Sequence, residues 1–253
     1  MNTRYLENEF TVYPLPVLED NITWILVYEN QAIIVDPSLA FPVINWLNLN
    51  NIEPCAILQT HHHIDHIGGT PELIKNWPKI KVLAASSDKE RIPFQNISVK
   101  EGDSINLIGF DIQILEVPGH TNNHISFYIE NHSSNKAILF CGDTLFSAGC
   151  GRIFEGTFSD MFFSLNKLNS LPSHTKIFCG HEYTLSNLKW AKKLRPNNRE
   201  LVSYHEKIQT LRINNQFSLP TSIESERKFN LFLQAKNIEE FKYLRIHKDN
   251  WNM

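Results

Sequence analysis

The sequence predicts a mixed α/β (α+β) fold whose carboxyl-terminal part is helical. Short runs of β-branched and aromatic residues, typical of strands, recur up to about residue 180. Helix start signals lie between some of these runs, and beyond residue 183 apolar residues recur at three- and four-residue intervals. Hydrophobic residues make up 42% of the 253 residues, which is enough apolar material for a folded core.

The strand predictions follow the apolar runs in chain order. They cover residues 24–28, 32–35, 56–58, 81–83, 112–117, 125–129, 137–141 and 176–179. A helix is expected to open at Thr70-Pro71, with Thr70 as its cap and Pro71 in the first helical position. Gly68 and Gly69 are expected to free the backbone for the turn into that helix.

The end of the chain has helical periodicity. The recurring apolar residues are Leu201, Tyr204, Ile208 and Leu211, followed by Ile238, Phe241 and Leu244. Asn237 is expected to cap the last helix, with Glu240 three residues later as in a capping box. The change in pattern predicts a division of the chain into residues 1–182 and residues 183–253.

Composition narrows the possible partners and the compartment. Lysine and arginine number 24 against 27 acidic residues, a net charge of -3, so we expect neither nucleic-acid nor membrane binding. The amino-terminal residues do not form a signal peptide, and we expect a cytoplasmic protein. Four cysteines without a C-x-x-C pair are expected to be reduced and mostly buried. No apolar stripe demands a second copy, so a monomer is the default.

The segment THHHIDHIGG at residues 60–69 concentrates possible metal ligands. It holds four of the 11 histidines of the chain, together with Asp65. His61 and His63 stand at alternate positions after a predicted strand, so their rings project to the same side while the chain stays extended. A solvated polar loop is the alternative interpretation. Neutral imidazole and carboxylate are common zinc ligands, and this density favours metal binding.

Three later apolar runs each end in a glycine followed by a possible ligand: ILEVPG before His120, ILFCG before Asp143 and IFCG before His181. If these runs are neighbouring strands, their ends meet the histidine segment at one sheet edge. The full set is His61, His63, Asp65, His66, His120, Asp143 and His181. Seven ligands exceed the need of one tetrahedral ion and suit two ions ~3.5–4 Å apart with a bridging carboxylate.

These motifs resemble the metallo-β-lactamase superfamily, and specifically its hydroxyacylglutathione hydrolase (glyoxalase II) branch. The resemblance is carried by T-H-H-H-x-D-H-x-G-G at 60–69, P-G-H-T at 118–121, C-G-D-T at 141–144 and G-H-E-Y-T at 180–184. L-E-D-N-x-x-W at 18–24, G-C-G-R-x-F-E-G-T at 149–157 and H-K-D-N-W at 247–251 extend it along the chain. It implies an αββα metallo-β-lactamase-like sandwich as the catalytic domain, residues 1–182, and a helical substrate-binding domain, residues 183–253.

The resemblance also implies roles for individual residues. It places His61, His63 and His120 on one metal, Asp65, His66 and His181 on a second, and Asp143 as the bridge. The two divalent ions are expected to be zinc, although iron and manganese accept the same ligands. Asp143 and Asp65 are the implied catalytic residues, and a hydroxide held between the metals is the implied nucleophile. We expect His62, His124 and Asp36 to support the ligands rather than bind metal.

The implied reaction is hydrolysis of S-(2-hydroxyacyl)glutathione thioesters such as S-D-lactoylglutathione, the second step of methylglyoxal detoxification. Arg152, Phe154 and Tyr183 are the implied substrate contacts. The family usually carries Asn-Pro-Phe-Leu-Arg in its helical domain, where the arginine binds a carboxylate of glutathione. This chain has Asn-Leu-Phe-Leu-Gln at 230–234, and Gln234 cannot form a charge-assisted bidentate pair, which predicts weaker glutathione binding.

Other functions fit parts of the pattern. A persulfide dioxygenase of the same fold holds a single iron with fewer ligands, and the intact Asp65 and His66 favour two metals instead. A lactone, β-lactam or other thioester hydrolase is a further alternative. The superfamily also includes nucleic-acid phosphodiesterases, which the net charge of -3 disfavours. A non-catalytic metal-binding protein would be expected to use cysteine thiolates in a closed site.

Overall fold

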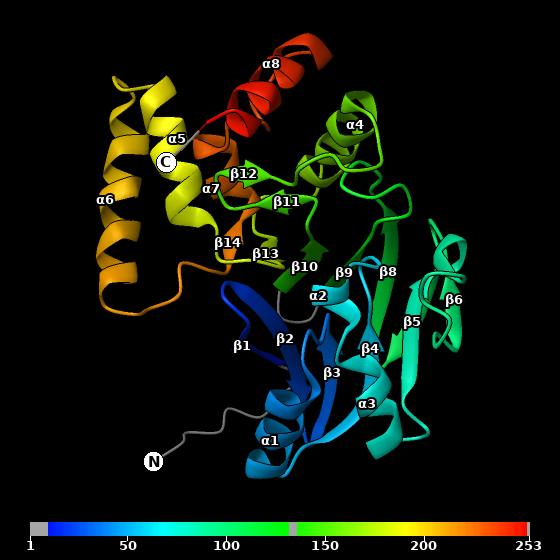
Figure 1. Ribbon diagram of the computed structural model, residues 1–253. Helices are drawn as coiled ribbons and strands as arrows, with labels where there is room; N and C mark the ends of the chain where they lie inside the picture. The colour runs from blue at the N-terminus through cyan, green and yellow to red at the C-terminus, as the bar shows by residue number, and fades with distance from the viewer. Residues whose placement is uncertain (1–9, 132–135, 252–253) are drawn as a thin grey trace.

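The computed structural model describes residues 10–131 and 136–251 and confirms the mixed α/β fold, built on two six-stranded sheets (Figure 1). Across the first sheet, the strands are β1 (Thr11–Val17), β2 (Asn21–Tyr28), β3 (Gln31–Val35), β4 (Glu53–Leu58), β5 (Lys81–Ala85) and β6 (Ile97–Val99). Across the second, they are β14 (Thr221–Ser222), β13 (Lys176–Cys179), β10 (Lys136–Gly142), β9 (Ile125–Asn131), β8 (Phe110–Glu116) and β7 (Ser104–Leu107).

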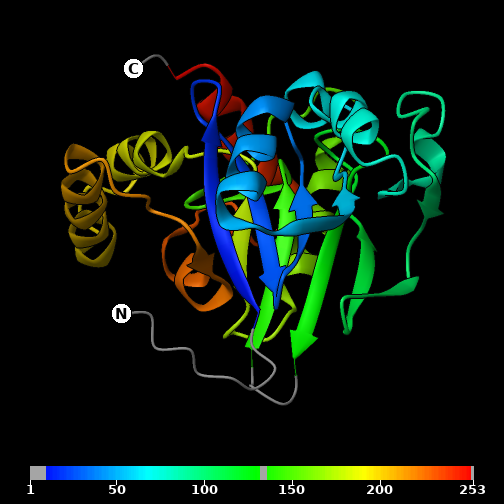
Figure 2. The same ribbon diagram turned by 90° about the horizontal axis from the view of Figure 1, so that it is seen from below.

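Successive side chains along the strands of the first sheet point to opposite faces, and both faces are covered. Trp24 and Leu26 of β2 join the large cluster that also contains residues of the second sheet, and Trp24 packs edge-on against Phe178 of β13. Ile25, between them, joins a separate cluster beneath α1 (Ala40–Asn50) and α3 (Thr70–Asn76). Figure 2 shows these two helices on the outer face of the first sheet. A strand buried on both sides reads as a continuous apolar run.

The remaining helices lie around the second sheet and at one end of the sandwich. They are α2 (Ile64–Ile67), α4 (Phe158–Asn169), α5 (Thr184–Leu194), α6 (Arg199–Ile213), α7 (Ile223–Phe229) and α8 (Ile238–Asp249), with a 3-10 turn at Ser86–Asp88. Ser164 of α4 donates to the backbone oxygen of Pro118 at 2.7 Å, which holds α4 against the end of β8. Figure 1 shows α5 and α6 on the left and α8 at the top, above the small hairpin β11 (Leu145–Phe146) and β12 (Gly149–Cys150).

All eight predicted strands are confirmed to within a few residues. β1 was not predicted because Pro14 and Pro16 interrupt its apolar pattern. Both prolines are tolerated because β1 is an edge strand of its sheet and pairs with β2 alone. The short strands β6, β7, β11, β12 and β14 also lacked a recognisable sequence signal.

Two expectations about the start of α3 were wrong. Thr70 is its first helical residue rather than its cap, because the Thr70 hydroxyl donates to Oε1 of Gln59 at 3.1 Å. Gly68 and Gly69 have ordinary helical backbone angles. They are needed for close approach instead, since a Cβ at Gly69 would lie 2.6 Å from the backbone nitrogen of Ala40.

The cap of α8 is confirmed, with one difference. The Asn237 side chain accepts from the backbone nitrogen of Glu240 at 2.9 Å. The Glu240 carboxylate, however, accepts from the backbone nitrogen of Lys236, one residue before the position that a capping box requires.

Within residues 10–131 and 136–251, no helix combines the length and apolar character that crossing a membrane requires. All four cysteines are free thiols.

Candidate metal centre

Strand ends bring the possible ligands together. β10 and β13 are adjacent and parallel; β10 ends directly before Asp143, and β13 ends two residues before His181. β8 runs parallel to β10 with β9 between them, and its end leads to His120. In the other sheet β4 ends at Leu58, and the backbone oxygen of Thr60 accepts from Ile125 at the start of β9. The histidine segment therefore meets all three later runs.

Close packing at this edge explains the glycine that precedes each ligand. Gly142 has a φ of +47°, and a Cβ there would lie 2.3 Å from the Thr60 hydroxyl oxygen. A Cβ at Gly180 would lie 2.5 Å from Oδ1 of Asp143. A side chain at either position would collide with the site, so the sequence pattern of an apolar run, a glycine and a ligand has a steric cause.

His61, His63 and His120 form one group of possible ligands. One nitrogen from each ring lies within 4.8 Å of the others. Nε2 of His120 is 3.0 Å from Nδ1 of His63. His61 and His120 are buried, whereas His63 is partly exposed.

Asp65, His66 and His181 form a second group with the same spacing limit. Oδ2 of Asp65 is 3.6 Å from Nε2 of His66 and 3.5 Å from Nε2 of His181. The Asn21 amide donates to that same Oδ2 at 3.0 Å and so helps to hold the Asp65 carboxylate in place.

The carboxylate of Asp143 lies between the two groups. Its Oδ1 is 3.4 Å from Nε2 of His66, and its Oδ2 is 3.2 Å from Nε2 of His181. The same Oδ2 is 3.6 Å from Nε2 of His120, in the first group. Asp143 is the one ligand candidate that contacts both groups through a carboxylate, as a bridging ligand requires.

Four of the ligand histidines have a polar partner at Nδ1, the ring nitrogen that faces away from the centre of the site. Nδ1 of His181 lies 2.8 Å from Oδ1 of Asp20, and Nδ1 of His66 lies 3.0 Å from Oδ2 of Asp36. Nδ1 of His120 lies 2.8 Å from the backbone oxygen of Arg152. The remaining contact joins Nδ1 of His61 to the Thr60 hydroxyl at 3.0 Å. In each ring Nε2 is left for the interior of the site, the arrangement that metal-binding histidines usually show.

The expected supporting residues have such contacts. The Asp36 carboxylate also accepts from the backbone nitrogen of Thr60 at 2.8 Å. The ring of His124 stacks on His61 with centroids 4.6 Å apart, and its Nε2 accepts from the backbone nitrogen of Asp143 at 3.1 Å. His62 points away from both groups, toward Arg91 and Glu155.

Burial and mutual charge shift the acidity of the site. Burial opposes ionisation of Asp143, yet the neighbouring His66 and His181 hold its pKa well below the usual range. Burial also opposes protonation of His66, but the carboxylates of Asp143 and Asp36 raise its pKa well above its ordinary value. Burial and His120 lower the pKa of His63 to about 4. The carboxylate is therefore ionised and His63 is neutral near pH 7, the forms in which both bind metals.

The arrangement fits divalent metal ions. Nε2 of His61, Nε2 of His66 and Oδ1 of Asp143 are buried and have no hydrogen-bond partner among the described residues. Buried polar atoms without partners are costly, and atoms of this kind that converge from several elements are typical of a ligand site. Imidazole and carboxylate donors without thiolates suit zinc, iron or manganese.

A cavity of about 710 Å³ opens onto the two groups. The three residues expected to contact substrate, Arg152, Phe154 and Tyr183, all line it. The ring of Tyr183 stacks on His181 with centroids 4.7 Å apart, and Phe154 packs edge-on against His63 and His120.

Two cations in this cavity were missed by sequence reasoning. Arg245 and Lys248, both on α8, line its wall. Arg245 is buried, donates to the backbone oxygen of Cys150 at 2.9 Å and pairs with Asp249. Burial, with the adjacent Arg245, lowers the pKa of Lys248 to about 7. The H-K-D-N-W match at 247–251 contains Lys248 and was the sequence feature that could have indicated a role for this residue.

Gln234, which stands where the family usually has a glutathione-binding arginine, lies outside the cavity. The exposed Gln234 side chain donates to the backbone oxygens of Arg227 and Lys228, each at 3.0 Å, and so caps the end of α7. The cavity takes its positive charge from Arg152, Arg245 and Lys248 instead.

The chain is similar to known proteins along nearly its whole length. Residues 18–181 match the metallo-beta-lactamase superfamily, and residues 182–251 match the hydroxyacylglutathione hydrolase C-terminus. A hydroxyacylglutathione hydrolase of Prochlorococcus marinus (strain MIT 9211) is 50% identical over 97% of this chain and 98% of its own. One from Synechococcus sp. (strain CC9605) is 46% identical over 95% of this chain and 98% of its own.

Solved structures share the fold at lower identity. The B3 metallo-beta-lactamase BLEG-1 is 22% identical and aligns over 88% of this chain and 99% of its own, with a TM-score of 0.67. ETHE1 from Myxococcus xanthus is 23% identical and aligns over 97% of this chain and 92% of its own, also with a TM-score of 0.67. These likenesses establish the αββα sandwich architecture.

Proposed function

The chain belongs to the hydroxyacylglutathione hydrolases of the metallo-β-lactamase superfamily, and on this premise we propose that it hydrolyses S-(2-hydroxyacyl)glutathione thioesters such as S-D-lactoylglutathione. The products are glutathione and a 2-hydroxy acid, D-lactate for that substrate. The observation that carries this proposal is the meeting of two ligand groups at Asp143, on the floor of a cavity with cationic walls. A small anionic thioester fits both features.

We infer that His61, His63 and His120 hold one divalent ion and that Asp65, His66 and His181 hold the other, with Asp143 between them. The spacing within each group and the unpartnered buried nitrogens support this assignment. Zinc is the ion that we propose. When bound, such a pair lowers the pKa of water toward 7 and polarises a carbonyl oxygen.

Neighbouring residues orient the proposed metal ligands. Asp20, Asp36 and the backbone oxygen of Arg152 hold Nδ1 of three histidines, so the opposite nitrogens stay directed into the site. Asn21 holds the Asp65 carboxylate from the other side. These contacts hold the ligand side chains in the orientation that the proposed ions require.

The cavity walls suit glutathione, which carries two carboxylates. Arg152, Arg245 and Lys248 supply positive charge, while the rings of Phe154 and Tyr183 supply apolar contact near the ligands. The thiolate of glutathione is a good leaving group because the reference pKa of a thiol is about 8.5. We therefore assign no protonated side chain to the leaving sulfur.

We further propose that residues 1–182 form the catalytic domain and residues 183–253 the substrate-binding domain. Both α5 and α8 belong to the second part and line the cavity. Ser186 and Asn187 come from α5, and Arg245 and Lys248 come from α8. We also propose that the enzyme acts as a monomer in the cytoplasm, where free thiols such as these four cysteines persist.

Comparison of thiol carriers tests the substrate assignment. The purified protein is assayed with S-D-lactoylglutathione, with a lactoyl thioester of a thiol that lacks carboxylates, and with glutathione persulfide in an oxygen electrode. We expect hydrolysis of the glutathione thioester with at least tenfold preference and no oxygen uptake. Equal rates on both thioesters would contradict the glutathione assignment, and oxygen uptake would indicate a persulfide dioxygenase.

A further inference from the structure

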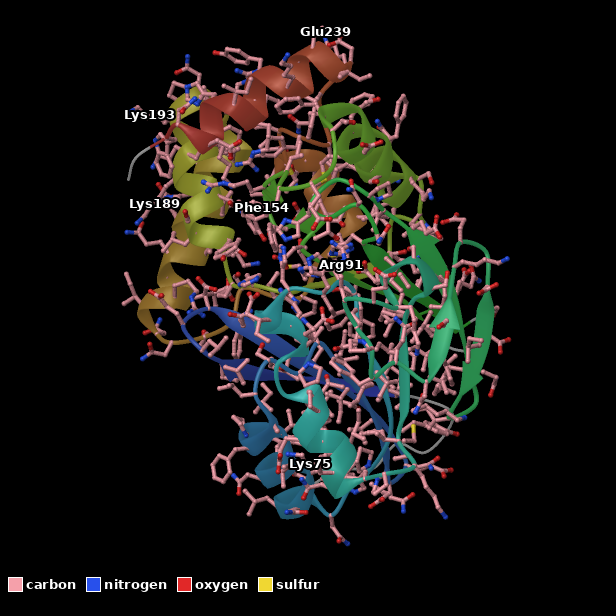
Figure 3. All side chains as sticks on the ribbon, turned by 45° about the vertical axis from the view of Figure 1, so that its right-hand side comes forward. Lys75, Arg91, Phe154, Lys189, Lys193 and Glu239 are labelled. Atoms are coloured by element: carbon pink, nitrogen blue, oxygen red, sulfur yellow. The ribbon has the colours of Figure 1, made fainter. Side chains whose placement is uncertain are left out.

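Arg91 is the centre of a polar cluster beside the metal centre. It follows the 3-10 turn Ser86–Asp88, and its Nε donates to Oδ1 of Asp88 at 2.8 Å. Its Nη1 donates to Oε1 of Glu155 at 2.7 Å and lies 3.3 Å from Nε2 of His62. Figure 3 shows Arg91 and Phe154 near the middle of the molecule, whereas Lys75 and Glu239 lie at its periphery.

The two carboxylates of the cluster extend it to a further loop. Asp88, which is fully buried, accepts from the side-chain amide of Asn123 at 2.8 Å. Glu155 accepts from the backbone nitrogen of Asn122 at 2.9 Å through its second oxygen. Arg91 therefore connects three loops: the histidine segment through His62, the loop after His120, and the loop that contains Glu155.

Two of these loops carry the three ligands of the first group, and the third loop packs against them. His62 lies between His61 and His63, and Asn122 lies two residues after His120. Glu155 follows Phe154, whose ring packs against His63 and His120 at centroid distances of 5.7 and 5.2 Å. In the described part of the chain, the hydrogen bonds and ion pairs of Arg91 reach none of Asp65, His66 and His181.

Removing the guanidinium would change the contacts of this cluster in a definite direction. The buried Asp88 carboxylate would lose the guanidinium that pairs with it and keep the hydrogen bond from the amide of Asn123, a costly state for a buried charge. The His62 ring already lies 3.7 Å from Asp88 and 3.4 Å from Glu155, so it would become their nearest alternative partner. A movement of His62 toward either carboxylate would displace its neighbours His61 and His63.

We propose that Arg91 is a positioning residue that sets the affinity of the His61, His63 and His120 group for its ion, independently of the second group. This inference rests on the proposed metal centre. Loss of an outer hydrogen-bond partner of metal ligands typically weakens metal binding by about 10- to 100-fold. We expect a loss of that size at the first group and none at the second.

The test measures Zn²⁺ binding in variants in which one ligand group is disabled. Asp65→Ala leaves the three-histidine group intact, and His63→Ala leaves the Asp65, His66 and His181 group. Arg91→Met is added to each, and Zn²⁺ affinity is measured by competition with a chromophoric chelator. We expect Arg91→Met to weaken binding about 10- to 100-fold in the Asp65→Ala background and to leave it unchanged in the His63→Ala background.

Arg227→Met is the matched control. Arg227 makes as many hydrogen bonds as Arg91, to Asn169, Ser173 and the backbone oxygen of Leu171, but at an exposed surface outside the cavity lining. It should change neither affinity. Arg91→Lys keeps the charge and should restore part of the Zn²⁺ affinity that Arg91→Met loses, which a loss of packing alone would not explain.

Several outcomes would overturn the proposal. Equal weakening in both backgrounds would show a general effect on folding, and unchanged affinity in both would show that Arg91 does not act on the ligands. If Arg91→Met fails to fold, as judged by circular dichroism, Glu155→Gln carries the same test with the same expected selectivity. Failure of the parent protein to bind two Zn²⁺ ions would refute the metal centre itself, which is a separate result.

Discussion

The carboxylate of Asp20 lies 2.8 Å from Nδ1 of His181, on the opposite side of the imidazole ring from Nε2, which faces Asp143 and Asp65. Asp20 belongs to the turn between β1 and β2, so a residue of the first sheet orients a ligand that follows a strand of the second. We predict that Asp20→Ala lowers the affinity of the Asp65, His66 and His181 group for its ion by about 10- to 100-fold. Competition titration with a chelator measures this affinity. The exposed Glu19→Gln is the control, and an Asp20→Ala protein with unchanged affinity would contradict the role of Asp20.

Asp143→Asn is predicted to lower the turnover number for S-D-lactoylglutathione by at least about 100-fold, because it removes the carboxylate that contacts both ligand groups. The fold should persist, since the substituted amide keeps the size of the side chain. Stopped thioester assays and thermal unfolding check the two parts of this prediction. Near-normal turnover with two metals bound would refute the bridging assignment.

Gln234→Arg is predicted to leave the Michaelis constant for glutathione thioesters unchanged, because residue 234 caps α7 and does not line the cavity. Arg152→Met should instead raise that constant about twofold to fivefold, as expected for the loss of an exposed ion pair with a substrate carboxylate. Steady-state kinetics of both variants distinguish these positions. A lower constant for Gln234→Arg would place residue 234 in the substrate site after all.

The affinity for the anionic thioester should depend on pH through Lys248. Burial lowers the pKa of Lys248 to about 7, so its ammonium group is charged below pH 7 and loses its charge as the pH rises above that value. The Michaelis constant should therefore increase between pH 7 and pH 9, and bound substrate should move the midpoint upward by favouring the charged form. In Lys248→Met this increase should disappear. An increase that survives the substitution would assign the titration to another group.

Local sequence patterns predicted most of the strands and all seven proposed ligands. Those residues follow apolar runs or stand in one short segment, so their spacing is visible without a structure. Arg245 and Arg91 had no comparable signal, because each is a single charged residue that reaches the site through the packing of α8 or the turn after β5. Asp20 lies in the L-E-D-N-x-x-W match, but the match does not reveal that its carboxylate contacts His181.

Two differences from the sequence pattern have the same origin. Thr70 was expected to cap a helix on local grounds, but its hydroxyl donates to Gln59 on the neighbouring loop. Gln234 stands where the family usually has a glutathione-binding arginine, yet it folds back on α7. In both cases a tertiary contact decided the role of a residue whose sequence neighbourhood allowed more than one.

Metal content measured together with hydrolysis tests the central claim most directly. The purified protein is stripped with a chelator, metals are counted by elemental analysis, and the hydrolysis of S-D-lactoylglutathione is followed as Zn²⁺ is returned in steps. We predict that activity falls with the chelated metal and is restored fully at about two ions per chain. Full activity in metal-free protein, or maximal activity at one ion per chain, would contradict a centre of two metals joined at Asp143.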